Sequence, residues 1–332
     1  MRVIQIGYGY WGANIARKLV ESPIFELAAV CELKPELRDK ARRELPESVA
    51  IEDDYTRYLA TDNIDAFVIA TQTEYSFAYA MAAMDAGKHV FIEKPIATTV
   101  ERTIRLKEKA EEKGVILHCD HIMLYNPYYR YIKGLIDAGE LGDLMYYETD
   151  KLNLGPIRRD VNALMDLAVH DIALLDWYTG GKMPEKVLAM GCTPFGQQET
   201  MTYLTLQYGK MMAGLRSSWI SPVKVRRTVI AGTKKMVVFD DMLPTGKVKL
   251  YDAHIDVQPG DTPDGNVYTV CQGDVQEIEI AFEDSIRNSL EAFADCAQRG
   301  VQSPSGPEQS LCVMRILEAA QQQLGKDAGG TK

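Results

Sequence analysis

A glycine-rich motif near the N-terminus restricts the fold more than any other feature of this chain. Val3–Ile6 form a short apolar run, and the pattern GxGxxG follows it directly as Gly7, Tyr8, Gly9, Tyr10, Trp11 and Gly12. In this pattern the first glycine permits a tight turn, the second lets a pyrophosphate approach the backbone, and the third allows close helix–strand packing. The sequence therefore predicts a strand–turn–helix unit in which these six residues bind the phosphates of a dinucleotide.

An acidic residue stands where such a unit needs one. Glu32 lies twenty residues after Gly12, at the end of the apolar segment Leu27–Cys31. A carboxylate at the end of the second strand bonds the ribose hydroxyls of NAD and repels the 2′-phosphate of NADP. We therefore expect NAD as the cofactor. NADP is the less favoured alternative, because Lys34 and Arg38 could accommodate a phosphate.

The order of strand-like and helix-like segments predicts two domains. Apolar strands alternate with helices up to about residue 122, which is typical of a parallel sheet covered on both faces. Short β-rich segments separated by Gly and Pro follow, together with four helical segments, and predict a mostly antiparallel sheet. We expect an α/β Rossmann domain over 1–122 and an α+β domain over 123–332. The helices expected in the second part are Pro127–Ala138, Ala163–Tyr178, Asp284–Gln298 and Pro307–Leu324.

Composition excludes some classes of function. The formal net charge is −10, whereas nucleic-acid binding needs a basic footprint. No apolar run approaches the length of a membrane span. The six cysteines are scattered and form no CxxC pair, which suits free thiols in a reducing cytoplasm. We therefore expect a cytoplasmic protein with a small-molecule substrate and neither a nucleic acid nor a membrane as partner.

Lys94 is the first candidate for chemistry. Glu93, Lys94 and Pro95 follow the strand-like segment His89–Ile92, at the carboxyl edge of the predicted parallel sheet, where ligands bind in open α/β folds. A lysine there can donate to a substrate hydroxyl or to the nicotinamide ribose. We expect Lys94 to bind both cofactor and substrate and Glu93 to contact the cofactor. The alternative is a surface lysine in a turn.

Asp166 and His170 are a candidate acid–base pair. They are four residues apart in the predicted helix Ala163–Tyr178, so they share one face. A carboxylate can then orient an imidazole, and such a pair suits removal of an alcohol proton while the carbon gives up a hydride. The alternative is a buried, structurally bonded histidine. Asp171 lies on another face and is expected to be structural.

Further polar and aromatic residues could line a substrate cleft. His118, Cys119, Asp120 and His121 resemble a metal cluster, but alternate residues of a strand point to opposite faces, so we expect no metal site. His121 or Asp120 could still face the substrate.

Two more residues are substrate-binding candidates. Arg158, beside Arg159, could meet a phosphate group, and the alternative is a solvated basic loop. Tyr125 could contact a sugar or base, and the alternative is packing between the domains.

The motifs in their order resemble the Gfo/Idh/MocA oxidoreductases. The resemblance rests on GYGYWG at Gly7–Gly12, EKP at Glu93–Pro95 and DxxxH at Asp166–His170, and it covers essentially the whole chain. It implies a Rossmann domain joined to a domain with a large open-faced, mostly antiparallel sheet. That sheet commonly packs against a partner subunit, so a homodimer or homotetramer is expected.

The resemblance also implies roles for single residues. Lys94 stands at the position of the family lysine, and Asp166 and His170 stand at the positions of its catalytic pair. Thr71 matches a family threonine near the cofactor, whereas Gln72 and Ser76 replace a proline and a histidine that many members carry. The stretch 153–160 is similar to members of nucleotide-sugar pathways.

Together these observations predict an NAD(P)-dependent dehydrogenase acting on CH–OH groups. We expect oxidation of a secondary hydroxyl of a sugar or sugar nucleotide by hydride transfer, leaning towards a UDP-N-acetylhexosamine 3-dehydrogenase. The alternatives are an NADPH-dependent ketosugar reductase, a free aldose or inositol dehydrogenase, and an NAD-binding sensor or regulatory protein. A sensor would be expected to lose the lysine or the Asp/His pair, and this chain keeps all three residues.

Overall fold

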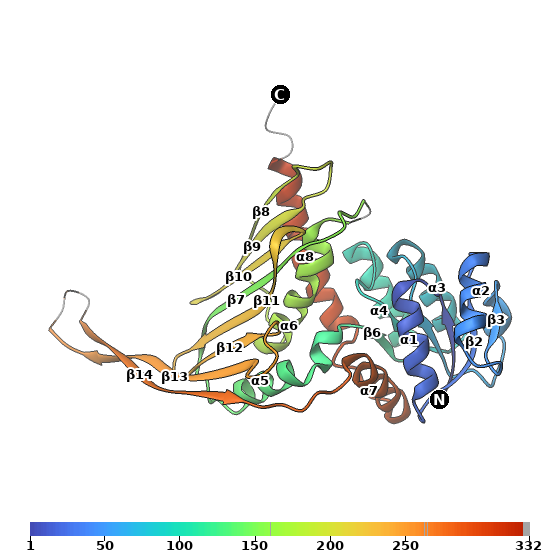
Figure 1. Ribbon diagram of the computed structural model, residues 1–332, viewed down its shortest axis with the longest axis horizontal. Coiled ribbons are helices and arrows are strands. Elements are labelled where there is room, and N and C mark those ends of the chain that lie inside the picture. The colour runs from blue at the N-terminus through green and yellow to red at the C-terminus, as the bar shows by residue number, and fades with distance from the viewer. Residues whose placement is uncertain (160, 262, 264, 328–332) are drawn as a thin grey trace. The chain divides into compact units, whose positions relative to one another are not determined.

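Short buried strands from the N-terminal third of the chain pair in parallel and form one sheet. The computed structural model describes residues 1–332 except 160, 262, 264 and 328–332 (Figure 1). It divides into unit 1, residues 1–126 with 283–315, and unit 2, residues 127–282 with 316–332. The two units are described separately below.

The sheet of unit 1 has the strand order β3-β2-β1-β4-β5-β6. Every strand pair in it is parallel. The order reverses between β1 and β4, and ligands bind at such a switch point in open α/β sheets. The elements of unit 1 are β1 (Arg2–Ile6), α1 (Tyr10–Glu21), β2 (Glu26–Cys31), α2 (Pro35–Glu44), β3 (Ala50–Glu52), η1 (Thr56–Tyr58), β4 (Ala66–Ile69), α3 (Thr73–Asp85), β5 (His89–Ile92), α4 (Val100–Lys113), β6 (Leu117–Cys119), η2 (Ile122–Tyr125) and α7 (Ser285–Arg299).

A late helix completes the core of unit 1. In α7, Leu290 and Phe293 are buried in the same apolar cluster as Val3 of β1 and Phe91 of β5. The helix begins at an N-cap, Asp284, whose carboxylate accepts from two backbone N–H groups of the first turn. Residues 283–315 thus belong to unit 1, whereas the sequence analysis assigned all of 123–332 to the second domain.

Unit 2 is built on an eight-stranded sheet in the order β14-β13-β12-β11-β7-β10-β9-β8. All its strand pairs are antiparallel except β10 with β7. The helix α8 (Pro307–Asp327) begins in unit 1 and ends in unit 2. The other elements of unit 2 are α5 (Pro127–Asp137), β7 (Leu144–Leu154), η3 (Leu164–Ala168), α6 (Val169–Thr179), β8 (Lys186–Cys192), β9 (Met201–Tyr208), β10 (Met211–Ser218), β11 (Ile220–Gly232), β12 (Met236–Asp240), β13 (Val248–Pro259) and β14 (Asn266–Ile278).

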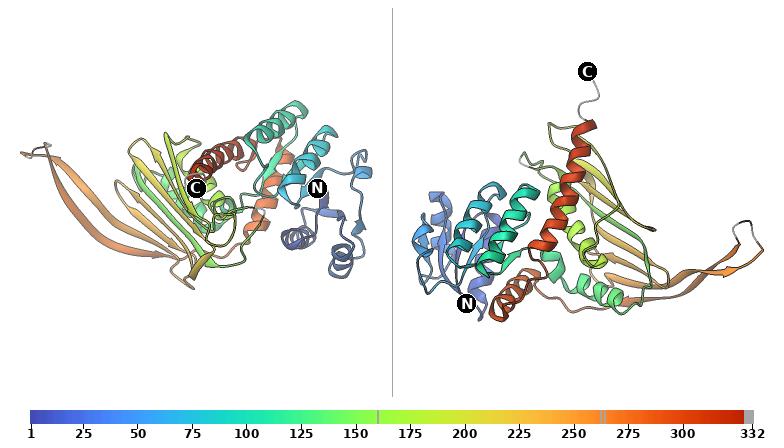
Figure 2. Two further views of the ribbon diagram at one scale, coloured as in Figure 1. Left: turned by 90° about the horizontal axis from the view of Figure 1, so that it is seen from above. Right: turned by 180° about the vertical axis from the view of Figure 1, so that it is seen from behind.

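Helices cover one face of this sheet, here called the inner face. Tyr147 of β7 contacts Tyr178 of α6, and Phe239 of β12 contacts Tyr129 of α5. Gln323 of α8 bonds the backbone of β8. Figure 2 shows α8 and α6 on the same side of the sheet. The predicted fold class, a Rossmann domain with a second, mostly antiparallel sheet, is confirmed.

Two strands of unit 2, β8 and β14, have a weak signal in the sequence. In β8 and β14 most side chains are exposed, and in β14 polar residues also interrupt the apolar positions. The pattern of one buried face, which identifies a strand, is therefore weak in both.

A buried ion pair connects this sheet to α6. Lys151 Nζ on β7 lies 3.2 Å from Asp171 Oδ1, and both side chains are almost fully enclosed. Burial raises the pKa of Asp171, and the ammonium of Lys151 opposes that shift. The prediction that Asp171 is structural agrees with this position. Removing one charge would leave the other buried without its counter-ion, which is costly.

We expect Lys151→Met to lower the free energy of unfolding of unit 2 by about 3 kcal/mol or more, because it leaves the buried carboxylate of Asp171 without the ammonium of Lys151. The double variant Lys151→Met/Asp171→Leu should recover most of this loss. Lys249→Met is the matched control, since its partner Glu277 is largely exposed, and should cost less than about 1 kcal/mol. Urea unfolding followed by fluorescence measures all three, and equal losses for both lysine variants would contradict the argument.

Candidate active site

In the turn after β1, the backbone at Gly7 packs directly against the backbone at Ala70. Gly7 has φ +97°, and a Cβ added there would lie 2.4 Å from the carbonyl oxygen of Ala70, at the end of β4. A Cβ on Gly12 would lie 2.5 Å from the carbonyl oxygen of Gly7. The buried amide of Gln5 donates to the carbonyls of both glycines. Side chains cannot occupy these two positions without moving backbone.

The middle glycine of the motif leaves open space. Nothing lies within 4 Å of a Cβ built on Gly9, and Gly9 is the N-cap of α1. No side chain in the described residues bonds this N-cap. The backbone N–H groups of the first turn and the helix dipole can therefore receive a phosphate. The residues present fit the pyrophosphate of a dinucleotide.

Glu32 is fixed against this turn from the end of β2. Its carboxylate accepts from the backbone N–H of Tyr8 at 2.8 Å and from that of Lys34 at 2.9 Å. The guanidinium of Arg38 donates to the carbonyls of Glu32 and Leu33. A negative charge and a positive charge thus lie together at the strand end where a ribose would bind.

The other predicted cofactor residues differ in exposure. Tyr8 is 1% exposed and its hydroxyl donates to Glu44, so only its backbone can face a ligand. Tyr10 and Trp11 are exposed and touch edge to face. The hydroxyl of Thr71 lies 3.0 Å from that of Ser76. Ser76 stands at the position where many members of the family carry a histidine.

Two carboxyl groups and Lys94 gather at the ends of β5 and β6. Burial and the neighbouring Asp120 raise the pKa of Glu93 to about 8, and Lys94 opposes the shift. Burial raises the pKa of Asp120 to about 6, against the effects of a bond from Ser289 and of Lys94. Like charges in one enclosed site cannot both ionise easily. The cluster therefore holds a proton near neutral pH, close to the predicted substrate lysine.

A chain of hydrogen bonds ends on Asp120. The hydroxyl of Ser289 donates to Asp120 at 2.7 Å, so Nε2 of His118, 3.1 Å from Ser289, must be a donor. Burial lowers the pKa of His118 to about 3, so its neutral ring accepts at Nδ1 from Ser303 at 2.8 Å. All three bonds are polarised towards Asp120, and they favour its charged form as a counter-ion for Lys94.

His121 and Tyr125 are more enclosed than the sequence analysis assumed. His121 is 1% exposed, and burial, with Lys94 adding to it, lowers its pKa to about 3. Tyr125 is 6% exposed, accepts from the hydroxyl of Ser305 and stacks on His118. Both lie in unit 1, and their contact with a substrate stays a prediction.

Unit 2 carries the predicted acid–base pair on an unusual turn. The predicted helix Ala163–Tyr178 is not α-helical throughout: Leu164–Ala168 form the π-helical turn η3, and the α-helix begins at Val169. Asn162 accepts from the backbone N–H of Met165 and caps this turn. Periodicity could not reveal it, because apolar residues fit both helix types. π-turns inside helices occur often at functional sites.

Asp166 is held by two partners. One carboxylate oxygen accepts from Arg158 at 3.1 Å, and the other accepts from the indole N–H of Trp219 at 3.2 Å. His170 is partly exposed one turn further along. The structure thus brings Arg158 to Asp166, and a contact of Arg158 with a substrate phosphate stays a prediction. Trp219 was not predicted because it lies 53 residues away in sequence and carries no motif. Asp160, in the stretch 153–160, lies outside the described residues.

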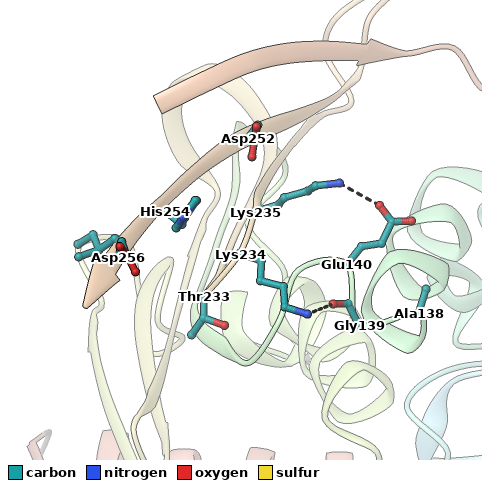
Figure 3. A pocket seen from close by; sticks show the side chains of 10 residues that line it. Ala138, Gly139, Glu140, Thr233, Lys234, Lys235, Asp252, His254 and Asp256 are labelled. Carbon is teal, nitrogen blue, oxygen red and sulfur yellow. Dashed lines mark hydrogen bonds and ion pairs between the residues drawn. The ribbon is translucent and has the colours of Figure 1, made fainter. Parts of the chain in front are cut away.

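A separate cavity of about 610 Å³ lies in unit 2, beside the end of α5 and the strand β13, which forms a hairpin with β14 (Figure 3). Its lysines are engaged, Lys235 with Glu140 and Lys234 with the carbonyl of Gly139. None of the residues predicted to bind cofactor or substrate lines it.

Comparison with known proteins places the chain in a family. Residues 1–121 match the family model described as "Oxidoreductase family, NAD-binding Rossmann fold", and residues 129–238 match the GFO/IDH/MocA C-terminal domain. The UDP-N-acetylglucosamine 3-dehydrogenase of Acidithiobacillus ferrooxidans is 31% identical over 68% of this chain and 70% of its own length. The scyllo-inositol 2-dehydrogenase (NADP(+)) of Bacillus subtilis strain 168 is 27% identical over 95% and 91%.

The fold agrees with these matches. A crystal structure of the same Acidithiobacillus enzyme superimposes with a TM-score of 0.83 at 24% identity, over 98% of both chains. The chain belongs to the GFO/IDH/MocA family of oxidoreductases. The predicted class of enzyme, an NAD(P)-dependent dehydrogenase, is confirmed.

The described residues also lack two structural features. No helix there combines the length and the apolar character that crossing a membrane requires. Nor do three or more His, Cys, Asp or Glu side chains in that part of the chain gather as a metal ion would need.

The raised pKa of Glu93 has a measurable consequence. Between the ordinary glutamate pKa and about 8, the folded chain holds a proton that the unfolded chain releases. Stability contributed by this group is therefore lost as pH rises through that window. Near pH 5 the free energy of unfolding of Glu93→Gln should be equal to that of wild type or lower. Relative to wild type it should then rise steadily towards about pH 8.

Urea unfolding midpoints of unit 1 across this pH range provide the measurement. Glu108→Gln, at an exposed position of α4, is the control and should follow the wild-type curve. A difference between Glu93→Gln and wild type that does not change with pH would contradict the assignment.

Proposed function

We propose that this enzyme oxidises a secondary hydroxyl of a sugar or sugar nucleotide with NAD, giving a keto sugar, NADH and a proton. The observation that carries the proposal is the position of Asp166 on the π-turn η3, where Arg158 and Trp219 fix its carboxylate, with His170 at the start of α6. Such a pair suits removal of a hydroxyl proton. Relatives named as dehydrogenases of an inositol and of a UDP-sugar support the substrate class.

In this proposal the chain's residues manage the proton. Bound NAD supplies the hydride acceptor, so the substrate carbon loses a hydride while its oxygen loses a proton. His170 takes that proton at its imidazole, the side chain that most often serves as a general base. Asp166 orients His170 and stabilises the imidazolium. Its own bonds to Arg158 and Trp219 keep the carboxylate in one place.

Lys94 is proposed to bind the reacting hydroxyl. Its ammonium is a donor, and a bond from it to the substrate oxygen favours the alkoxide that forms as the proton leaves. Asp120 accepts from Ser289, which is bonded in turn to His118, and its carboxylate supplies a counter-charge for the ammonium of Lys94. The protonated state of Glu93 avoids a second negative charge beside it.

The substrate is proposed to be a UDP-N-acetylhexosamine. The relative from Acidithiobacillus ferrooxidans, named for UDP-N-acetylglucosamine, supports this choice, as does the basic stretch around Arg158. A second candidate is an inositol, because the scyllo-inositol dehydrogenase matches 95% of this chain.

A substrate panel separates these candidates. Purified protein is mixed with NAD or NADP and with UDP-N-acetylglucosamine, UDP-glucose, free aldoses or inositols, and the reduced nicotinamide is followed by absorbance. A keto-acid acceptor is added in parallel, to regenerate a cofactor that stays bound. Turnover of a UDP-sugar with NAD supports the proposal, turnover of inositol alone moves it to the second candidate, and turnover of none of these sugars contradicts it.

His170→Asn tests the assignment of the base. We expect kcat to fall by roughly 10² to 10⁴, the usual contribution of a positioned base, with the Kd for NAD unchanged. His254→Asn, at a histidine of the distant hairpin in the same unit, is the control and should leave kcat unaltered. Titration of protein fluorescence gives the Kd, and a His170→Asn enzyme with near-normal kcat would overturn the role.

Glu32→Gln tests the preference for NAD. The substitution removes the charge that repels a 2′-phosphate but leaves an oxygen to accept from Tyr8. With Arg38 beside it, we expect the ratio of Kd values for NADP and NAD to fall by about tenfold, or about 1.4 kcal/mol. Glu36→Gln, in the first turn of α2, is the control. An unchanged ratio would mean that Glu32 does not select the cofactor.

A further inference from the structure

Asn162 is bonded on both sides of its amide, which is more than a helix cap requires. Its side chain is 1% exposed. The carbonyl Oδ1 accepts from the backbone N–H of Met165 at 3.0 Å, inside the π-turn η3. The amide Nδ2 donates to Glu199 Oε2 at 2.7 Å and to Gln321 Oε1 at 3.0 Å. One side chain thus connects η3 to the segment before β9 and to α8.

The chemistry of this amide fixes its orientation. A backbone N–H can only donate, so the atom that faces Met165 is the oxygen, and the amide hydrogens then point to the two acceptors. An aspartate has no hydrogen to give to a carboxylate, and a serine has a single donor. Capping alone would be served equally well by aspartate, which is as favoured as asparagine at the start of a helix. The bonds to Glu199 and Gln321 therefore account for the amide.

Glu199 has space made for it in β8. A Cβ on Gly191 would lie 2.7 Å from Cγ of Glu199 and 3.1 Å from its Cβ. Gly191 is not among the glycines with positive φ, so close approach and not backbone conformation accounts for a glycine at this position. The missing side chain leaves the room through which the stem of Glu199 reaches Asn162.

The same segment holds the tryptophan that bonds Asp166. The carbonyl of Glu199 accepts from the N–H of Ala163 at 2.9 Å. The carbonyl of the next residue, Thr200, accepts from the N–H of Trp219, also at 2.9 Å. The indole of Trp219 donates in turn to Asp166. The start of η3 and a donor to Asp166 are therefore fixed from one place, and moving Glu199 would disturb both.

The π-turn changes the angle between Asp166 and His170. In an α-helix 3.6 residues complete a turn, so residues four apart are displaced by about 40° around the axis. A π-turn has i→i+5 hydrogen bonds and more residues in each turn. Because Asp166 lies inside η3 and His170 is the second residue of α6, part of the winding between them is wider and the displacement is smaller. The winding of η3 thus brings the two side chains towards one line along the helix.

We propose that Asn162 is a positioning residue that sets the winding of η3 and so aligns Asp166 with His170. Glu199 and Gln321 anchor it. The inference rests on the proposed function, in which this pair removes the hydroxyl proton. Asn162 acts through the turn it caps and through its own carbonyl, which accepts from the N–H of Asp166 at 3.1 Å. Catalysis depends steeply on such alignment, because a misplacement of about 1 Å can lower a rate about a hundredfold.

The substitution Asn162→Asp separates positioning from capping. Aspartate keeps the acceptor for the N–H of Met165, but it places a carboxylate against that of Glu199. Since aspartate caps a helix as well as asparagine does, a cap alone predicts no change. We expect instead that kcat falls at least about tenfold, with KM changed less than about twofold and the Kd for NAD unchanged. Rates are measured with the sugar that the substrate panel identifies.

The double variant Asn162→Asp/Glu199→Gln is the rescue. It has the net charge of wild type, and the new amide at position 199 donates to the new carboxylate at position 162, so the bond returns with donor and acceptor exchanged. We expect its kcat to lie within about twofold of wild type. Gln323→Met is the matched control on α8. It removes a bond to β8, leaves Gln321 in place and should not change kcat.

A second measurement needs no substrate. The indole N–H of Trp219 gives its own signal in a ¹H–¹⁵N NMR spectrum, identified by its loss in Trp219→Phe, and this signal reports the bond to Asp166. Asn162→Asp should shift the signal. The double variant should return it towards its wild-type position, and Gln323→Met should leave it in place. Far-ultraviolet circular dichroism checks that each variant is folded.

The outcomes separate this inference from the proposed function. If the wild-type protein turns over none of the sugars, the proposed function fails, while a shifted indole signal in Asn162→Asp still supports the positioning of Asp166. An unmoved signal contradicts it and leaves Asn162 as a cap. A shifted signal with unchanged kcat overturns the role in catalysis. A double variant as slow as Asn162→Asp means that Glu199 is not the anchor, and this also overturns the proposal.

Discussion

The close contact between the glycine turn after β1 and the end of β4 is the constraint on which the architecture of unit 1 depends. A side chain on Gly7 would strike the backbone at Ala70, and one on Gly12 would strike the backbone of Gly7. Because the contact is between main chains, it cannot relax by rotating a side chain. It fixes the N-terminus of α1 against the switch point of the sheet, where Glu32 is bonded to the same turn. That geometry leaves the N-terminus of α1 at Gly9 open, as binding of a phosphate would require.

Features that depend on neighbouring residues could be predicted from the sequence. The glycine motif, Glu32 and the strand before Lys94 each combine a local pattern with a known position in a parallel sheet, and the structure places them at its carboxyl edge. Helix ends with their own signal were also predictable, as at Gly114, which adopts the left-handed conformation after α4. In these cases the physical cause lies within a few residues of the effect, so one sequence contains it.

Features that depend on distant residues could not be predicted. Ser289 bonds His118 across 171 residues, and no spacing in the sequence connects them. The same holds for α7, whose apolar stripe predicts a helix but does not show which core receives it.

The proposed base owes its position to the sheet more than to its own helix. His170 lies between two residues that the sheet region holds, Asp166 through Trp219 and Asp171 through Lys151. π-turns are rare, so contacts with the rest of the fold are expected to maintain this one. The indole of Trp219 and the buried ammonium of Lys151 provide such contacts to Asp166 and Asp171, which flank His170 in the sequence. The backbone of His170 can therefore remain in place even if the surface loop that carries Arg158 moves.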